Sequence, residues 1–332
     1  MCFVVKNSVT KKSVILLGLI ALLLGGAAAL WHTRATSERS RERERVVSGI
    51  VTTPHDSHRP QSSLATDGTE RSLPSNPALA EALSHTSRLD YALRLKAVHA
   101  LQGSALPPDQ AAFLRAFVAA PGIPTDLTIR QVRALKNDVL NVLCVQAGEE
   151  AATAEMLRAL YADETQDAGL RDYALQHLVT LIDRNPAIGW DTHWTAVESD
   201  NPALAATAML HLAAQLRAQS ASANLQPFSP SALQSLSSAA LRLAADTTAK
   251  DPARTTALQV CGQLKLTAAR PLAGEIARSD QAGLPLRIAA VATLGDLGGD
   301  ETTRAYLTTL TTGPEKRLRI PAQSALKRFS IN

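Results

Sequence analysis

The polar and apolar positions of the chain repeat in one helical pattern over most of its length. Arg287, Ala290, Leu294 and Leu297 lie at offsets of 3, 7 and 10 residues, which places them on one side of an α-helix. The pattern returns thirty-two residues later at Arg319, and the tripeptide Leu-Arg-Ile returns with it. Each unit is therefore predicted to contain one inward-facing helix, whose alanine lets a neighbouring helix approach closely.

Earlier copies of this pattern extend the repeat toward the N-terminus. They begin at Arg94, Lys136, Arg171 and Arg254. A second periodic stretch precedes each copy, and proline or glycine residues separate the stretches. The sequence predicts an all-α fold for residues 77–332, with about seven antiparallel helix pairs of about 37 residues each.

The best single copy resembles a HEAT repeat. It has an acidic residue in the turn, Asp280, followed by Leu-Arg287, by Ala290 and by Leu294-Gly295. The units are shorter than usual HEAT repeats, so the resemblance is to the short HEAT-like or armadillo-type repeats, and it covers residues 77–332. It implies a right-handed α-solenoid that presents an extended surface to another protein.

The repeated arginines are the most distinctive polar feature of the pattern. They allow two interpretations, a row of anion-binding groups or a structural ladder in which each arginine bonds a turn acid or carbonyls of an adjacent unit. Acidic residues stand in several turns, among them Asp167, Asp251, Asp280 and Glu315. We therefore predict a structural ladder, made of Arg94, Arg171, Arg254, Arg287 and Arg319.

A short polar segment on one predicted inner helix gives the candidates for a binding groove. Asp172, Tyr173 and His177 lie within six residues of one another there. They either line a groove or are ordinary residues of a helix face. No catalytic residue, cofactor site or metal site is predicted, because the sequence contains no nucleophile elbow, phosphate loop, dinucleotide fingerprint, His-Glu-x-x-His or Cys-x-x-Cys motif.

The N-terminal segment carries a membrane signal. Residues 14–31 contain no charge and follow Lys11 and Lys12. As a helix they extend about 27 Å, enough to cross the hydrocarbon core of a bilayer. Residues 1–31 are therefore predicted to be either a signal anchor, giving one N-terminal hydrophobic helix before the solenoid, or a cleaved signal peptide that releases a secreted form.

Export of the solenoid is the favoured orientation. The basic start, the apolar core and the Ala27–Ala29 site form an export pattern, whereas five arginines after the span would keep the C-terminal side in the cytoplasm. Residues 32–76 are rich in Ser, Pro, Thr and charge, and are predicted to be a disordered tether.

Charge and composition exclude one class of function. The chain is 45% apolar and 4% aromatic, which suits closely packed helices. Residues 1–76 carry 10 basic and 6 acidic side chains, whereas residues 77–332 carry 24 of each. The basic pI therefore comes from the N-terminal segment, and no nucleic-acid partner is predicted.

A membrane-tethered, non-enzymatic scaffold is the predicted function, with an unidentified protein as its partner. The alternative is an enzyme, or an accessory protein of an enzyme, that belongs to the short HEAT-like class and acts on a small molecule.

Overall fold

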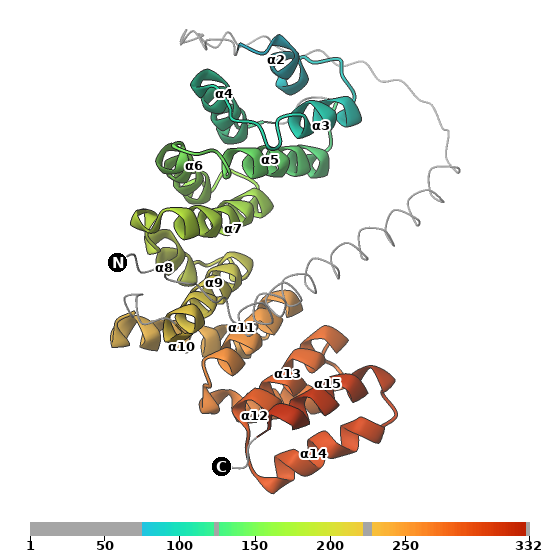
Figure 1. Ribbon diagram of the computed structural model, residues 1–332. Coiled ribbons are helices and arrows are strands. Elements are labelled where there is room, and N and C mark those ends of the chain that lie inside the picture. The colour runs from blue at the N-terminus through green and yellow to red at the C-terminus, as the bar shows by residue number, and fades with distance from the viewer. Residues whose placement is uncertain (1–74, 123–125, 222–227, 330–332) are drawn as a thin grey trace, which may run out of the picture. The chain divides into compact units, whose positions relative to one another are not determined.

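A computed structural model describes residues 75–122, 126–221 and 228–329 of the chain, and these residues form fourteen α-helices (Figure 1). The helices follow one another in seven pairs. The first helices of the pairs are α2 (Pro77–Leu83), α4 (Pro108–Ala119), α6 (Glu150–Ala162), α8 (Asp191–Val197), α10 (Pro230–Ala245), α12 (Arg270–Arg278) and α14 (Glu301–Thr312). The second helices are α3 (Tyr91–His99), α5 (Ile129–Leu143), α7 (Ala168–Arg184), α9 (Pro202–Ala221), α11 (Asp251–Gln263), α13 (Leu284–Leu297) and α15 (Lys316–Arg328). The prediction of an all-α chain of helix pairs is confirmed for these residues, and the handedness of the superhelix stays a prediction.

The second helices pack against one another in chain order, from α3 to α15 (Figure 1). We call this series the second-helix row. The first helices pack mainly against their own partners, and among them α4 and α6 also meet. Because every second helix touches the one before and the one after, the stability of the array is distributed over nearest-neighbour interfaces.

Small residues set the spacing of the row, as the sequence pattern indicates. The alanine three residues after the arginine is fully buried in four units, at Ala174, Ala257, Ala290 and Ala322. Leucines fill the remaining space of one continuous core. Cys144 and Cys261 are buried within this core, where a small apolar side chain is needed.

Glycines at one equivalent position leave room for the neighbouring second helix in two units. A Cβ added at Gly295 of α13 would lie 2.5 Å from the Cα of Ala325 in α15. A Cβ added at Gly262, the equivalent residue of α11, would lie 3.2 Å from the carboxylate of Asp296 in α13. The equivalent residue of α15 is the exposed Lys327.

Acidic and hydroxyl residues in the turns cap the helices that follow them. The side chains of Asp90, Asp167 and Asp300 accept hydrogen bonds from the backbone N–H groups at the starts of α3, α7 and α14. Thr128 and Gln131 form a reciprocal capping box at the start of α5. The acidic turn residue of the repeat pattern is thus a helix cap in several units.

The membrane predictions concern residues outside the described part of the chain. The span 14–31 lies entirely outside it, as does the tether 32–76 except for its last two residues. Within residues 75–329, apart from the two gaps, no helix combines the length and the apolar character that crossing a bilayer requires.

Candidate functional site

The pattern arginines bond the C-terminal end of the first helix in their own pair. The acceptor carbonyls therefore belong to the same pair and not to an adjacent unit, whereas Arg254 and Arg287 also lie near the predicted turn acids Asp251 (4.0 Å) and Asp280 (3.7 Å). The carbonyls at a helix C-terminus lack intrahelical partners and lie at the negative end of the helix dipole, so a guanidinium stabilises them. The bonds run from Arg171 Nε to Tyr161 O (2.7 Å), from Arg254 Nε to Ala244 O (3.2 Å), from Arg287 Nε to Ala277 O (3.4 Å) and from Arg319 Nε to Gly313 O (3.0 Å).

A lysine has the same position in the second pair. Lys136 is buried, and its Nζ donates to Ala120 O at 2.7 Å, at the end of α4. Burial lowers the pKa of Lys136 to about 8. The fourth pair has an alanine, Ala205, at this position and no basic residue.

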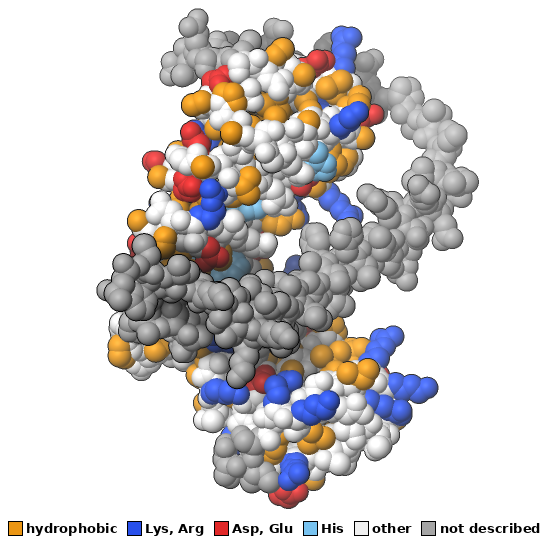
Figure 2. Space-filling model, in the orientation of Figure 1, with side chains coloured by type: hydrophobic (Ala, Val, Ile, Leu, Met, Phe, Trp, Pro, Cys, Tyr) orange, Lys and Arg blue, Asp and Glu red, His pale blue; other side chains and the backbone are white. Residues whose placement is uncertain are grey.

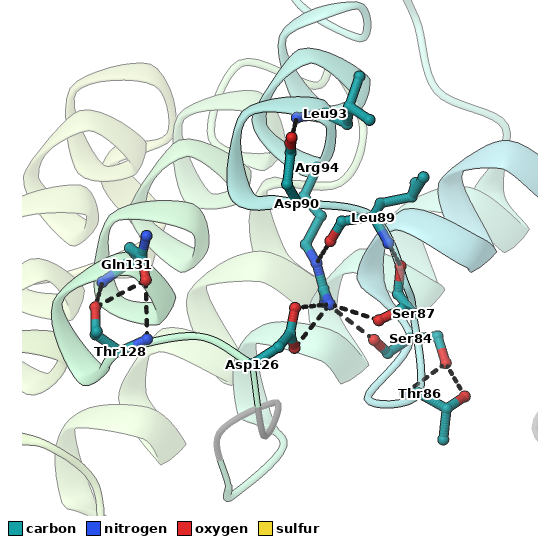
Figure 3. Close-up of polar contacts among 10 residues, drawn as sticks. All are labelled: Ser84, Thr86, Ser87, Leu89, Asp90, Leu93, Arg94, Asp126, Thr128 and Gln131. Carbon is teal, nitrogen blue, oxygen red and sulfur yellow. Dashed lines mark hydrogen bonds and ion pairs between the residues drawn. The ribbon is translucent and has the colours of Figure 1, made fainter. Parts of the chain in front are cut away.

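Arg94 makes the most extensive contacts of the series (Figure 3). Its side chain is completely buried. It donates to the carbonyls of Ser84, Ser87 and Leu89, which form the turn between α2 and α3. One amino group also reaches both carboxylate oxygens of Asp126, at 2.9 and 2.8 Å, in the turn that precedes α5. Arg94 is therefore the pattern arginine that links two neighbouring units.

Five further ion pairs connect helices of the array, four of them between neighbouring units and Arg184–Glu150 within the third pair, and the sequence analysis missed them. Each pair joins a basic and an acidic residue about one repeat apart in the sequence, and this spacing of opposite charges is the signal that could have revealed them. They are Arg115–Glu149, Arg133–Asp167, Arg184–Glu150, Arg242–Glu198 and Arg328–Asp296.

The weak contacts of Arg287 lead to a prediction about its role. Its carbonyl bond is long at 3.4 Å, and its ion-pair partner Asp280 is 91% exposed at 3.7 Å. Arg287→Ala is therefore expected to lower the free energy of unfolding by less than about 1 kcal/mol, since exposed ion pairs contribute little. Chemical denaturation measures this change, and a loss above about 3 kcal/mol would show a buried partner that these contacts do not account for.

Two of the three predicted groove residues line an open cavity of about 340 Å³ between α5 and α7. Tyr173 and His177 lie in its wall, and Asp172 does not. We call it the amide cavity, because three of its polar side chains are amides. Its lining residues are Asn137, Asn141, Cys144, Val145, Tyr173, Gln176, His177 and Thr180.

Asp172 does not line the amide cavity, but it bonds Gln176, which does. Burial raises the pKa of this carboxyl group. One oxygen accepts a hydrogen bond from Thr207 in α9 at 2.6 Å, and the other accepts one from Gln176 at 2.8 Å. Asp172 therefore fixes the orientation of Gln176, which belongs to the lining.

The titratable groups of the amide cavity are held in their neutral forms at pH 7. Burial lowers the pKa of His177 to about 4, and His177 Nε2 donates to Asn137 Oδ1 at 3.0 Å. Burial also raises the pKa of the Cys144 thiol to about 12 and raises the pKa of Tyr173. The cavity therefore offers neutral hydrogen-bond donors and acceptors, with no thiolate or imidazolium.

The amides Asn137, Asn141 and Gln176 and the hydroxyl of Thr180 were missed by the sequence analysis. Asn137 and Asn141 are four residues apart on α5, and Gln176 and Thr180 are four apart on α7. This spacing places each pair on one face of its helix. The spacing alone does not show that the two faces adjoin, because that depends on how α5 and α7 pack.

A buried histidine pair lies in the fourth helix pair. His193 of α8 is completely buried, and its Nε2 lies 3.1 Å from Leu175 O and 3.2 Å from His211 Nδ1. A carbonyl accepts only, so Nε2 carries the proton of a neutral imidazole, and the buried Nδ1 has no partner among the described residues. Burial, together with the charge of His211, lowers the pKa of His193 to about 3.

Acid is expected to destabilise the fold through His193. The unfolded imidazole has a pKa near 6.5, above the folded value, so the stabilisation is complete above that pH and is lost as the pH falls. The loss should approach about 1.4 kcal/mol per pH unit below pH 6. His193→Gln should reduce the change in the free energy of unfolding between pH 7 and 5, and His85→Gln, at an exposed site, should not. Equal changes in both variants would contradict this prediction.

No group of three or more His, Cys, Asp or Glu side chains that could hold a metal ion is found in the described part of the chain.

No family model matches the sequence, and no curated protein matches it. Solved structures do match it. The described chain is an α-helical repeat protein.

The matching structures are distant. Human deoxyhypusine hydroxylase in complex with glycerol is 16% identical, with 76% of this chain and 94% of that chain covered and a TM-score of 0.35. A computationally designed armadillo repeat protein for modular peptide recognition is 16% identical, with 71% and 99% covered and a TM-score of 0.37. A second designed armadillo repeat protein is 15% identical, with the same coverage and a TM-score of 0.36. Similarity at this level does not assign an activity or a ligand to this chain.

Proposed function

We propose that the protein is a non-enzymatic scaffold, tethered to a membrane by residues 14–31, whose second-helix row binds an extended segment of a partner protein. The observation that carries this proposal is the amide cavity between α5 and α7. It lies open on the row and is lined by neutral hydrogen-bonding side chains from two successive units.

The amide side chains suit the main chain of a peptide. Each carboxamide offers two N–H donors and a carbonyl acceptor, so one side chain can bond a peptide C=O and N–H together. An extended segment exposes these groups along its length. Asn141 and Gln176 are exposed, and Val145 beside them is 56% exposed and offers apolar contact to a side chain of the partner.

The neutral state of the cavity supports binding over catalysis. A general base works best when its pKa lies near the working pH, whereas the pKa of His177 is about 4. A nucleophilic cysteine reacts as the thiolate, whereas the pKa of Cys144 is about 12. The enzyme alternative therefore lacks an activated group at this site.

Binding by variants of the full chain tests the scaffold. The partner segment is identified by crosslinking, and its peptide is titrated against Asn141→Ala, Gln176→Ala and the double variant. We expect the double variant to weaken binding more than tenfold. Gln259→Ala, which removes an exposed amide from α11, is the matched control and should change binding less than twofold. If His177→Ala instead abolished turnover of a small molecule while the fold stayed intact, the enzyme alternative would replace the scaffold.

Export of the solenoid is a separate expectation. It follows from the basic N-terminus, the apolar residues 14–24 and the Ala27–Ala29 site. A reporter that is active only after export should be active when fused after Asn332, and a reporter that works only in the cytoplasm should be inactive. The reverse result would place the C-terminal side in the cytoplasm, as the positive-inside count of the flanking residues requires.

A further inference from the structure

A second cavity, of about 180 Å³, lies in the last two helix pairs. It is lined mainly by α12, with one residue each from α13 and α14. We call it the arginine cavity. Its lining residues are Arg270, Pro271, Gly274, Arg278, Leu294 and Thr303. It shares no residue with the amide cavity, so an inference about it does not depend on the proposed function.

Arg270 is only partly coordinated by the protein. One of its amino groups, Nη2, donates to Leu297 O at 3.2 Å. Its Nε is buried and has no hydrogen-bond partner among the described residues. A guanidinium carries five N–H donors in a planar fork, so most of the donor capacity of Arg270 is left for another acceptor.

Arg278 is held in place without a carboxylate. Its guanidinium lies over the ring of Tyr306 in α14, 4.3 Å from the centroid, and Nη1 donates to Gly274 O at 3.0 Å. Stacking on an aromatic face orients the fork and leaves its remaining donors free. Among the described residues, neither Arg270 nor Arg278 forms an ion pair.

The nearby carboxylates are engaged elsewhere. Asp300 lies near Arg270, and its Oδ1 accepts hydrogen bonds from the backbone N–H and the hydroxyl of Thr303, both at 2.8 Å. Asp280 lies near Tyr306 and pairs with Arg287. In the described part of the chain, neither of these carboxylates forms a close ion pair with the two guanidinium groups at the cavity.

The surrounding part of the chain is also basic. Residues 77–249 carry 12 basic and 17 acidic side chains, whereas residues 250–332 carry 12 basic and 7 acidic ones. The solenoid is neutral as a whole, but its positive charge is concentrated toward its C-terminal units. Figure 2 shows Lys and Arg side chains gathered on the part of the visible face over α13–α15. This field attracts anions to the last two pairs.

We propose that the arginine cavity binds a compact oxyanion, a phosphate group or a carboxylate. The free donors of Arg270 and Arg278 contact its oxygens, as planar guanidinium groups do with both kinds of anion. Leu294 and Pro271 form the apolar part of the wall. The phosphate and the carboxylate differ in geometry and charge, so separate titrations distinguish them.

Inorganic phosphate and sodium acetate are the probes, titrated by calorimetry into the full chain at constant ionic strength set with chloride. We expect saturable binding of at least one of them. Saturation by phosphate alone identifies a phosphate ligand, and saturation by acetate identifies a carboxylate ligand. If neither anion saturates, the proposal is overturned.

Three glutamine variants locate the binding. Arg270→Gln and Arg278→Gln should each weaken it at least tenfold. Arg304→Gln removes the same charge from an exposed position of α14 and should change it less than twofold. Equal weakening in all three would show a diffuse electrostatic effect and overturn the proposal. Far-UV circular dichroism checks the fold, and Arg278→Lys provides a second variant, which should weaken binding because it keeps the charge but loses the fork.

Discussion

Gly295→Ala is expected to be one of the most destabilising substitutions in the chain. The added Cβ would lie 2.5 Å from the Cα and 2.7 Å from the carbonyl oxygen of Ala325. Both are backbone atoms of α15, so no side-chain rotation relieves the contact, and α15 must move away from α13. Overpacking of this kind outweighs the better helix propensity of alanine, and the net loss should be about 2 kcal/mol.

Gly169→Ala is the matched control for this substitution. Its added Cβ would also be closer than 3 Å to other atoms, but these belong to the guanidinium of Arg133, which can rotate. The expected change in the free energy of unfolding is therefore less than about 1 kcal/mol, because moving Arg133 disturbs only its partly exposed ion pair with Asp167. Chemical denaturation compares the two variants, with hydrogen exchange in α13 and α15 to locate the effect. Similar losses in both variants would show that backbone contact does not set the spacing of these helices.

Arg94→Ala should cost more, about 3–5 kcal/mol, because it removes a completely buried side chain and leaves several carbonyls without their donor. The side chain of Arg94 is 0% exposed and bonds Asp126 and the carbonyls of Ser84, Ser87 and Leu89. The loss should be concentrated in the first two helix pairs, which hydrogen exchange in α2–α5 measures.

Two comparisons test this explanation. Arg242→Ala breaks a pair with Glu198 in which the side chains are 64% and 55% exposed, so it should cost less than about 1 kcal/mol. Arg94→Ala combined with Asp126→Ala should be about as unstable as Arg94→Ala alone, because Asp126 is 41% exposed and water solvates its carboxylate once the guanidinium is gone. If the double variant lost as much free energy of unfolding as the two single variants together, the two residues would act independently.

The local part of the fold could be predicted from the sequence, because the helical periodicity is strong. The offsets from Arg287 placed Ala290, Leu294 and Leu297 on one face, and all three are buried. The direction of the arginine bonds could not be predicted in the same way. It depends on where the first helix ends in space, since the acceptor, Ala277 O, belongs to that end.

The candidate site was predicted only in part, for a related reason. Tyr173 and His177 were recognised as a polar segment of one helix, and both line the amide cavity. Asn137 and Asn141 lie about one repeat earlier, and the packing of α5 on α7 brings them to the same cavity. Such packing is set by side chains throughout the interface and does not follow from the spacing of four residues.

The close approach at Gly262 and Gly295 also has a consequence for how this array could be lengthened. A copy of the α12–α13 unit inserted ahead of α14 would bring its own glycine, so each second helix would still meet a neighbour without a side chain in the way. A copy placed after α15 would meet Gln323 and Lys327, which stand where α13 has Val291 and Gly295. Duplication of whole units is therefore compatible with the interior of this solenoid, whereas addition behind α15 first requires those two side chains to change.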